Sequence, residues 1–378
     1  MQRNGVLLLL FWIALAGVFV LTLVGMASAV PHYAGRPIEP PTPTTKSKNI
    51  GFAFSGAGGR LPQEFAMVEA LVRGYTPNGQ KLRPVIVSGV SAGALTAVMM
   101  SAAIQQQETG KGPSWEDCKQ VIFNVTDSTI YDSSVWGLAR IFTHNIYAGY
   151  ILDNTPFIKF MQGLINEYGY RTMGDLYIPT IITVVNQTTG EPIRLDSRNP
   201  AHRGLSLLDV LTATTSIPPA FPYSTIAGVD GRFVDGGVGT DAVPTIPLLS
   251  ERNPRIDEIY VIVRQMTGLD LPGWSASIPI LYNSIAAIST FIEEAIATSI
   301  SVAAQSDRPA FLYTPILNTS FGLFDFQHEK LQYDMTHEWA TKNNPLALNS
   351  DSRFTSTLEV KRLISGVKAK QGAPQQQK

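Results

Sequence analysis

The stretch Pro84–Gln107, PVIVSGVSAGALTAVMMSAAIQQQ, decides the fold and contains a candidate nucleophile. It begins with the apolar, β-branched run Val85-Ile86-Val87, which is typical of a buried parallel strand. A turn from Gly89 to Gly93 follows, and then an alanine-rich stretch with helical spacing. A serine on a strand-to-helix turn, with a glycine two residues away on each side, is the pattern of a nucleophile elbow. Ser91 is therefore the first candidate for chemistry.

The two glycines of this turn, Gly89 and Gly93, have a physical reason. The turn is strained, and a side chain at either position would crowd the adjacent strand or helix. The helix that follows brings backbone N–H groups and a positive partial charge to the place where an oxyanion would form.

A second glycine-rich turn lies between an expected strand, Ile50–Phe54, and an expected helix, Pro62–Arg73. Its sequence is Ser55-Gly-Ala-Gly-Gly-Arg-Leu61, and such small residues let several backbone N–H groups face one point. The stretch lacks G-K-[ST] and the spacing of a dinucleotide loop, which excludes both of those motifs. An oxyanion hole, a phosphate cradle and a simple tight turn all remain open from these residues alone.

Strands and helices alternate along the rest of the chain, which predicts an α/β fold with a mostly parallel central sheet flanked by helices. The other expected strands are Tyr177–Val185, Glu191–Leu195, Arg232–Asp235 and Ile256–Val263. The other expected helices are Trp115–Phe123, Ile151–Glu167, Ser206–Thr214 and Pro279–Gln305. The apolar spacing of the last helix favours core packing over a lipid-facing lid.

Composition excludes several classes of protein. The chain has 378 residues, of which 44% are hydrophobic and 16% charged, as in a globular protein with a substantial core. A net charge of −1 leaves no basic footprint for nucleic acid. Cys118 is the only cysteine, so no intrachain disulfide can form, and no Cys/His spacing predicts a metal site.

The N-terminus has the pattern of a targeting segment. Val6–Met26 is apolar and uncharged, and Ala27-Ser28-Ala29 fits a small-residue cleavage site. Residues 1–29 are thus expected to be a signal peptide or an uncleaved transmembrane signal anchor, and both remain open. Either predicts the secretory pathway: a secreted or lumenal protein if the leader is cleaved, a membrane-anchored one if not. The sequons at Asn124, Asn186 and Asn318 are compatible with a glycoprotein on that route.

Three further boundaries follow from composition. Residues 30–48 are proline-rich and predict an extended linker. The catalytic domain is expected at 49–345. Residues 346–378 are expected to form a polar C-terminal tail that is disordered at its end.

A nucleophilic serine needs a base. The chain has five histidines, and none lies in a recognisable loop after an expected strand. Asp235 differs, because it ends an expected strand and is followed by Gly236 and Gly237, which permit close approach of another backbone. An aspartate placed in this way can face a serine on a neighbouring elbow.

With these motifs in place, the sequence resembles the patatin-like phospholipase family over about residues 49–263, and more weakly to about 345. Four motifs occur in the family's order and carry the resemblance. They are Phe54-Ser-Gly-Ala-Gly-Gly-Arg60, Gly89-Val-Ser-Ala-Gly93, Ala213-Thr-Thr-Ser-Ile-Pro-Pro-Ala-Phe-Pro222 and Asp235-Gly-Gly237.

The resemblance implies a three-layer patatin-like fold and a Ser–Asp dyad that hydrolyses acyl lipids without a metal or other cofactor. Ser91 would attack the ester carbonyl, and Asp235 would take its proton and pass it to the leaving alcohol. Backbone N–H groups of Gly56, Ala57 and Gly58 would hold the oxyanion, with Arg60 steadying the loop. The implied partners are an acyl lipid and a membrane or lipid interface.

The sequence departs from the family pattern at three positions. Ala57 and Leu61 replace glycines of the loop, and Asp241, six residues after Asp235, replaces an asparagine. A second carboxylate close to Asp235 would raise its pKa.

Two other functions remain open. One is an α/β-hydrolase with Ser91 and a late base, His328 or His337, since the serine precedes both histidines. The other is a non-catalytic, membrane-tethered binding protein of the same fold.

Overall fold

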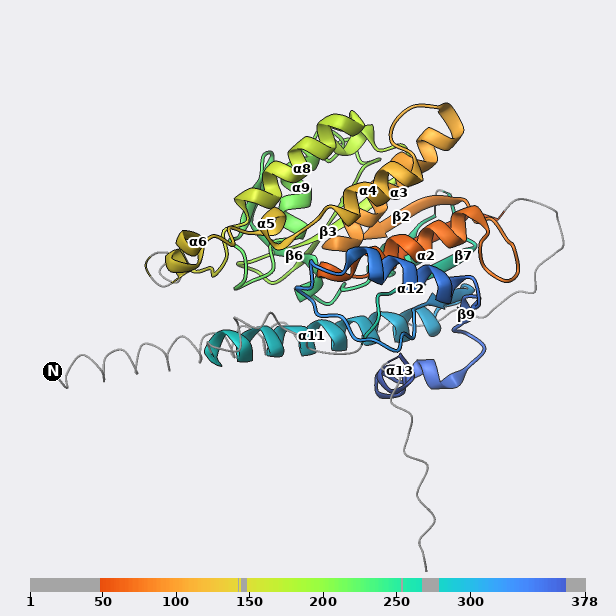
Figure 1. Ribbon diagram of the computed structural model, residues 1–378. Helices are drawn as coiled ribbons and strands as arrows, with labels where there is room; N and C mark the ends of the chain where they lie inside the picture. The colour runs from red at the N-terminus through yellow and green to blue at the C-terminus, as the bar shows by residue number, and fades with distance from the viewer. Residues whose placement is uncertain (1–47, 142, 144–147, 253, 267–278, 365–378) are drawn as a thin grey trace, which may run out of the picture.

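A nine-stranded sheet forms the centre of the computed structural model, which describes residues 48–141, 143, 148–252, 254–266 and 279–364 (Figure 1). The expected leader, most of the linker and the end of the tail lie outside these residues. The strand order is β5-β6-β3-β2-β1-β7-β8-β9, with β4 paired to β3. The strands are β1 (Ile50–Phe54), β2 (Pro84–Gly89), β3 (Thr180–Asn186), β4 (Pro192–Asp196), β5 (Ser224–Ile226), β6 (Val229–Asp235), β7 (Glu258–Ile262), β8 (Ala310–Tyr313) and β9 (Leu346–Ala347).

The middle of the sheet is parallel and its margins are antiparallel. Strands β3, β2, β1, β7 and β8 are joined by parallel ladders. Strands β4 and β6 pair antiparallel with β3, and β9 pairs antiparallel with β8. All residues of β1 and β7 are buried, which explains why both strands are apolar apart from Glu258 at the start of β7. The predicted α/β class and mostly parallel sheet are confirmed.

Helices cover both faces of the sheet and make three layers. The longer helices are α2 (Leu61–Arg73), α3 (Ala92–Thr109), α4 (Trp115–Phe123), α8 (Thr155–Tyr168), α9 (Leu207–Thr214), α11 (Pro279–Ala304), α12 (Glu329–Ala340) and α13 (Thr357–Ile364). The shorter ones are α5 (Asp127–Ile130), α6 (Val135–Arg140) and α10 (Ile246–Ser250). On β1, Phe54 faces Gly93 of α3, whereas Gly51 faces Leu248 of α10. Since these positions are an odd number of residues apart, α3 and α10 lie on opposite faces.

Helix α11 packs against the domain, as the core interpretation predicted. Ile288, Ile292, Ile296 and Ile300 are all buried, and α13 lies beside the helix (Figure 1). Among the described residues, α11 alone is long and apolar enough to cross a membrane, but more than half of its most apolar window is buried in the fold. Burial of this kind is what a core helix requires.

The folded region extends past the expected boundary at residue 345. Phe354, Val360 and Ile364 are buried, and Lys361 on α13 pairs with Glu294 on α11 at 2.6 Å. These contacts anchor residues up to 364 to the domain. Because residues 346–364 are mostly polar, their sequence did not predict that Phe354, Val360 and Ile364 would be buried.

Candidate active site

Ser91 occupies a strained elbow between β2 and α3. Its backbone has φ +54° and ψ −134°, and no other non-glycine residue in the described ranges has a positive φ. Such a conformation costs about 1–3 kcal/mol and persists only where surrounding structure enforces it. The Ser91 amide donates a hydrogen bond to the Thr214 hydroxyl at 3.0 Å, which helps to hold the turn.

Contacts around the two elbow glycines explain why neither position carries a side chain. A Cβ at Gly89 would lie 2.7 Å from the carbonyl oxygen of Gly93. A Cβ at Gly93 would collide with the Ser55 carbonyl oxygen and the Phe54 side chain. The expected crowding of strand and helix is therefore present at both positions.

Ser91 and Asp235 come together because β2 and β6 share one edge of β3. Strand β4 occupies the other edge along Ile181–Val185. On the shared edge, Gly89 at the end of β2 lies opposite Ile182, and Asp235 at the end of β6 lies opposite Val184. The parallel strand and the antiparallel strand thus end two positions apart along β3, and their C-terminal turns meet there.

The segment that begins at Ala213 ties both residues to this junction. The Thr214 hydroxyl, which accepts from Ser91, donates to the Thr183 carbonyl on β3 at 2.7 Å. The Asp235 amide donates to the Ser216 carbonyl at 2.9 Å. Neither role was predicted, although both residues lie inside the third motif.

Asp235 is a buried carboxyl with one unused oxygen. Its Oδ1 accepts from the Gly237 amide at 2.7 Å, and its Oδ2 has no hydrogen-bond partner among the described residues. Burial raises the pKa of Asp235 to about 7, while the nearby Ser91 side chain and the Gly237 amide lower it. A Cβ at Gly236 would collide with the Thr183 carbonyl and with Val90, so only glycine lets this turn pack against the elbow.

Asp241 does not act on Asp235 in the way a close carboxylate would. Its carboxylate accepts from Arg194 Nε at 2.7 Å and is buried beside it. Burial, and not Asp241, accounts for the raised pKa of Asp235.

The glycine-rich loop lies against the elbow, and its amides are used unequally. The Gly56 amide donates to the Ala242 carbonyl at 3.2 Å, and the Gly59 amide donates to the Leu323 carbonyl at 2.8 Å. Within the described part of the chain, the amides of Ala57 and Gly58 donate no hydrogen bond. Gly56 packs beside the Ser91 Cβ, but its N–H is already engaged, which leaves Ala57 and Gly58 as the loop's free donors.

Two buried arginines, Arg60 and Arg264, fix the position of the glycine-rich loop. Arg60 donates from Nε to the Phe321 carbonyl at 2.6 Å and from Nη1 to the Gln265 carbonyl at 3.0 Å. Arg264, which is also fully buried, donates to the Gly56 carbonyl at 3.2 Å. The loop is thereby fixed to two later segments of the chain.

None of the described histidines lies beside Ser91. His328 is exposed and contacts Asp325 at 2.9 Å, His337 stacks on Tyr333, and His202 accepts from the Asp196 amide. His32 and His144 fall outside the described residues.

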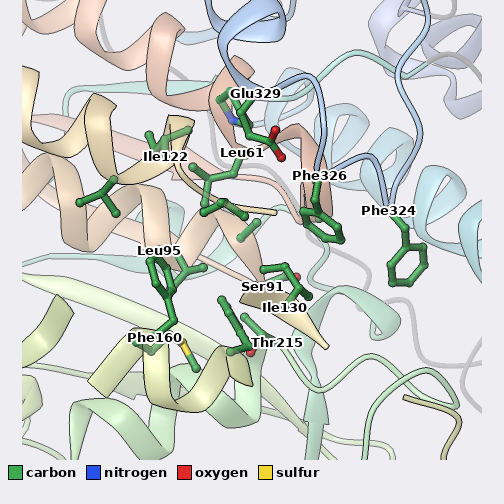
Figure 2. Close-up of a pocket in the computed structure, with 18 of the residues that line it drawn as sticks. Leu61, Ser91, Leu95, Ile122, Ile130, Phe160, Thr215, Phe324, Phe326 and Glu329 are labelled. Atoms are coloured by element: carbon green, nitrogen blue, oxygen red, sulfur yellow. The ribbon is translucent and has the colours of Figure 1, made fainter. Parts of the chain in front are cut away.

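An apolar cavity opens in front of Ser91, with about 850 Å³ of empty space when its open mouth is counted. Figure 2 shows Ser91 among side chains that include Leu95, Ile130 and Phe160. Gly58 and Ala92 also line it, which brings the loop, the elbow and the cavity together. The lining residues come mainly from α2, α3, α4, α5 and α8, from the segment that follows α9, and from a late segment.

That late segment supplies lining residues that sequence analysis missed. Leu323, Phe324, Phe326 and Glu329 all line the cavity, and the Leu323 carbonyl binds the glycine-rich loop. The cluster of aromatic residues in Phe321–Phe326 was a signal, but without helical or alternating spacing it predicted no element.

A comparison with protein families finds a match over the part of the chain that contains this site. The family model described as "Patatin-like phospholipase" matches residues 52–249, which contain the glycine loop, the elbow and Asp235. The chain belongs to the patatin-like phospholipase family. Membership in this family makes the chain a lipid acyl hydrolase at the family level.

Two other comparisons add context to the family match. The crystal structure of VipD from Legionella pneumophila is similar with a TM-score of 0.40 and 16% sequence identity, covering 78% of this chain and 67% of that one. No curated protein sequence matches significantly.

In the part of the patatin-like chain that the structure describes, no group of three His, Cys, Asp or Glu residues could hold a metal ion.

Proposed function

We propose that this protein hydrolyses carboxylic esters of acyl lipids through an acyl-enzyme on Ser91, with Asp235 as the general base. The observation that supports the proposal is the junction on β3, where the turns that carry Ser91 and Asp235 meet, the Ser91 side chain lowers the pKa of the Asp235 carboxyl, and Ser91 lines an apolar cavity. A candidate nucleophile, a candidate base and an apolar cavity are what ester hydrolysis of a lipid requires.

The proposed reaction has two halves. Asp235 takes the proton from Ser91 Oγ as that oxygen bonds to the acyl carbon and the carbonyl oxygen becomes an oxyanion. The free amides of Ala57 and Gly58, together with Ala92 at the start of α3, would donate to the oxyanion. The ester C–O bond then breaks, and Asp235 gives its proton to the leaving alcohol. Water attacks the acyl-enzyme with Asp235 again as base, releasing the fatty acid and restoring Ser91.

The cavity supports an acyl chain as the group bound beside Ser91. Its described lining is almost entirely aliphatic and aromatic, which is the character of a site for an apolar ligand. Each methylene buried there contributes about 0.8 kcal/mol to binding. We propose that the acyl chain of the substrate enters the cavity from a membrane or lipid interface, where acyl lipids reside.

The alternatives receive less support. A histidine base would need a ring beside Ser91, and His328 and His337 both lie outside the cavity lining. A purely binding role leaves unexplained the strained backbone of Ser91 and the free amides beside it.

Narrowing the cavity tests the substrate class. In Leu95→Trp, a bulky ring would fill the space one helical turn after Ser91, so we expect kcat/KM for a 12-carbon nitrophenyl ester to fall at least about 10-fold. Activity on the 2-carbon ester should change less than about 3-fold. Leu346→Trp, on the half-exposed strand β9, is the matched control and should alter neither.

Equal losses on both esters in Leu95→Trp would refute the acyl-cavity assignment. Failure of the full chain to release fatty acid from any nitrophenyl ester or from phosphatidylcholine vesicles would refute the proposed hydrolase.

The pH dependence follows from the pKa of Asp235. Only its ionised form can accept a proton, and that form predominates above about pH 7. We therefore expect kcat/KM on a short nitrophenyl ester to fall about tenfold per pH unit below 7 and to reach a plateau above it. A profile flat down to pH 5 would contradict Asp235 as the base.

A further inference from the structure

One acidic side chain lines the otherwise apolar cavity, and the reaction proposed above does not use it. Glu329 is the first residue of α12, and its side chain is only 6% exposed. Its Oε1 has no hydrogen-bond partner among the described residues. Figure 2 shows the Glu329 carboxyl oxygens turned toward the cavity, near Phe326. A buried polar atom of this kind costs stability unless something bonds to it.

The surroundings of Glu329 restrict what that partner can be. No lysine, arginine or histidine is among the described lining residues, so an anionic group would meet no positive charge. Asp325 and Asp127 bind His328 and Gln327 respectively, and the charges of both act to raise the pKa of Glu329. A phosphate or free carboxylate inside the cavity would therefore be repelled.

Burial favours an uncharged partner over an ammonium group. The attraction within an ion pair between apolar walls must offset the free-energy cost of removing two charges from water. Burial raises the pKa of Glu329 to about 8, so the carboxyl is mostly neutral at pH 7. A neutral carboxyl donates one hydrogen bond and accepts others, which matches a hydroxyl group because a hydroxyl does the same.

We propose that Glu329 hydrogen-bonds a substrate hydroxyl inside the cavity and makes the enzyme prefer esters that carry one there. This inference rests on the proposed function, since it takes the cavity as the acyl-ester site. The hydroxyl has two sources, a hydroxylated acyl chain or a free hydroxyl of a glycerol leaving group. Glu329 is in this view a specificity-determining residue and takes no part in bond breaking.

Two matched substrate pairs separate the sources. Methyl hydroxystearate is compared with methyl stearate, and monopalmitoylglycerol with its di-O-methyl ether. We expect the parent to prefer the hydroxylated member of one pair about 3- to 10-fold in kcat/KM. Glu329→Gln, which keeps a donor and an acceptor, should retain the preference, and Glu329→Met should lose it. Glu338→Met on the exposed side of the same helix is the control and should retain it.

A choline ester of the same acid tests the charged alternative. If the parent prefers the choline ester over the methyl ester and Glu329→Gln loses that preference, the cavity binds an ammonium group and the proposal is overturned. Hydroxyl preferences that are absent in the parent, or that persist in Glu329→Met, would overturn it as well.

Binding without turnover separates this inference from the proposed function. In the Ser91→Ala background, displacement of a fluorescent fatty alcohol by the same methyl esters and glycerol ethers measures Kd directly. A hydroxyl preference in Kd that Glu329→Met abolishes supports the assignment even if the parent hydrolyses nothing, in which case only the hydrolase proposal fails. Equal Kd values within both pairs refute the role of Glu329.

Discussion

Ser91→Ala is expected to lower kcat for ester hydrolysis by about 10⁴-fold or more, because no acyl-enzyme can form without the hydroxyl. Asp235→Asn is expected to cost about 10²–10⁴-fold, because an amide cannot take the serine proton. Both losses should appear on a short nitrophenyl ester, for which binding in the cavity contributes little. Steady-state kinetics beside a thermal melt of each variant provide the measurement.

The stability of Asp235→Asn separates a catalytic role from a structural one. The pKa of Asp235 is about 7 in the folded protein and about 3.8 in an exposed chain, so folding favours the protonated form. The resulting penalty is absent below about pH 3.8, grows as the pH rises toward 7, and stays constant above 7. Removing the charge should therefore leave Tm at pH 8 equal to or above that of the parent while activity is lost.

Asp241→Asn is the matched control, because it makes the same change at another buried aspartate. Burial raises the pKa of Asp241 as well, and the pair with Arg194 offsets only part of that rise, so Tm at pH 8 is expected not to fall and kcat to be largely retained. Wild-type activity in Asp235→Asn would overturn the dyad. A large loss of Tm in Asp235→Asn at pH 8 would show that the carboxylate supports the fold instead.

The local motifs were predictable because their residue types reflect local conformation and burial. The clash that requires Gly89 arises within the turn, the clash that requires Gly93 comes from Phe54 and Ser55 at the end of β1, and the apolar run before Ser91 reflects burial in the middle of the sheet. Boundaries were less exact: the helix expected from Ile151 begins at Thr155, where Pro156 occupies its first turn.

The meeting of Ser91 and Asp235 is a property of topology rather than of spacing. It depends on β4 taking one edge of β3, which leaves the other edge to β2 and β6 in succession. The residues near Asp235 do not predict which edge of β3 its strand will occupy, and only the order of the motifs suggested that Asp235 lies near Ser91. The anchoring roles of Thr214 and Ser216 depend on the same junction and stayed hidden for that reason.

The apolar cavity was the least predictable part of the site. Its walls come from helices α2, α3, α4, α5 and α8, from the segment after α9, and from Leu323–Glu329, which lies more than 200 residues after the elbow. The Gly56 amide illustrates the same limit at a smaller scale. The family resemblance implied three donors, Gly56, Ala57 and Gly58, but the Ala242 carbonyl, which belongs to a distant turn, already accepts from the first of them.

Gly58→Ala is expected to lower kcat by about 10²–10³-fold, the effect of losing one oxyanion donor. Gly58 has φ +55°, and a Cβ there would lie 2.5 Å from the Leu323 carbonyl oxygen and 2.7 Å from its Cδ1. The loop must therefore shift, and the free amides of Ala57 and Gly58 would move with it. KM for a short ester should change little, because the oxyanion exists only after attack.

Gly79→Ala isolates the effect of position from that of conformation. Gly79 has a similar φ of +63°, but a Cβ there meets nothing within 4 Å, and the residue lies outside the cavity lining. Both alanines must adopt a left-handed backbone, at a cost of about 1–2 kcal/mol, so both should lower Tm. Only Gly58→Ala should lose activity in excess of its loss of folded protein, since only its loop faces the reacting carbonyl. Parallel losses of kcat in the two variants, or none in Gly58→Ala, would remove the glycine-rich loop from the proposed mechanism.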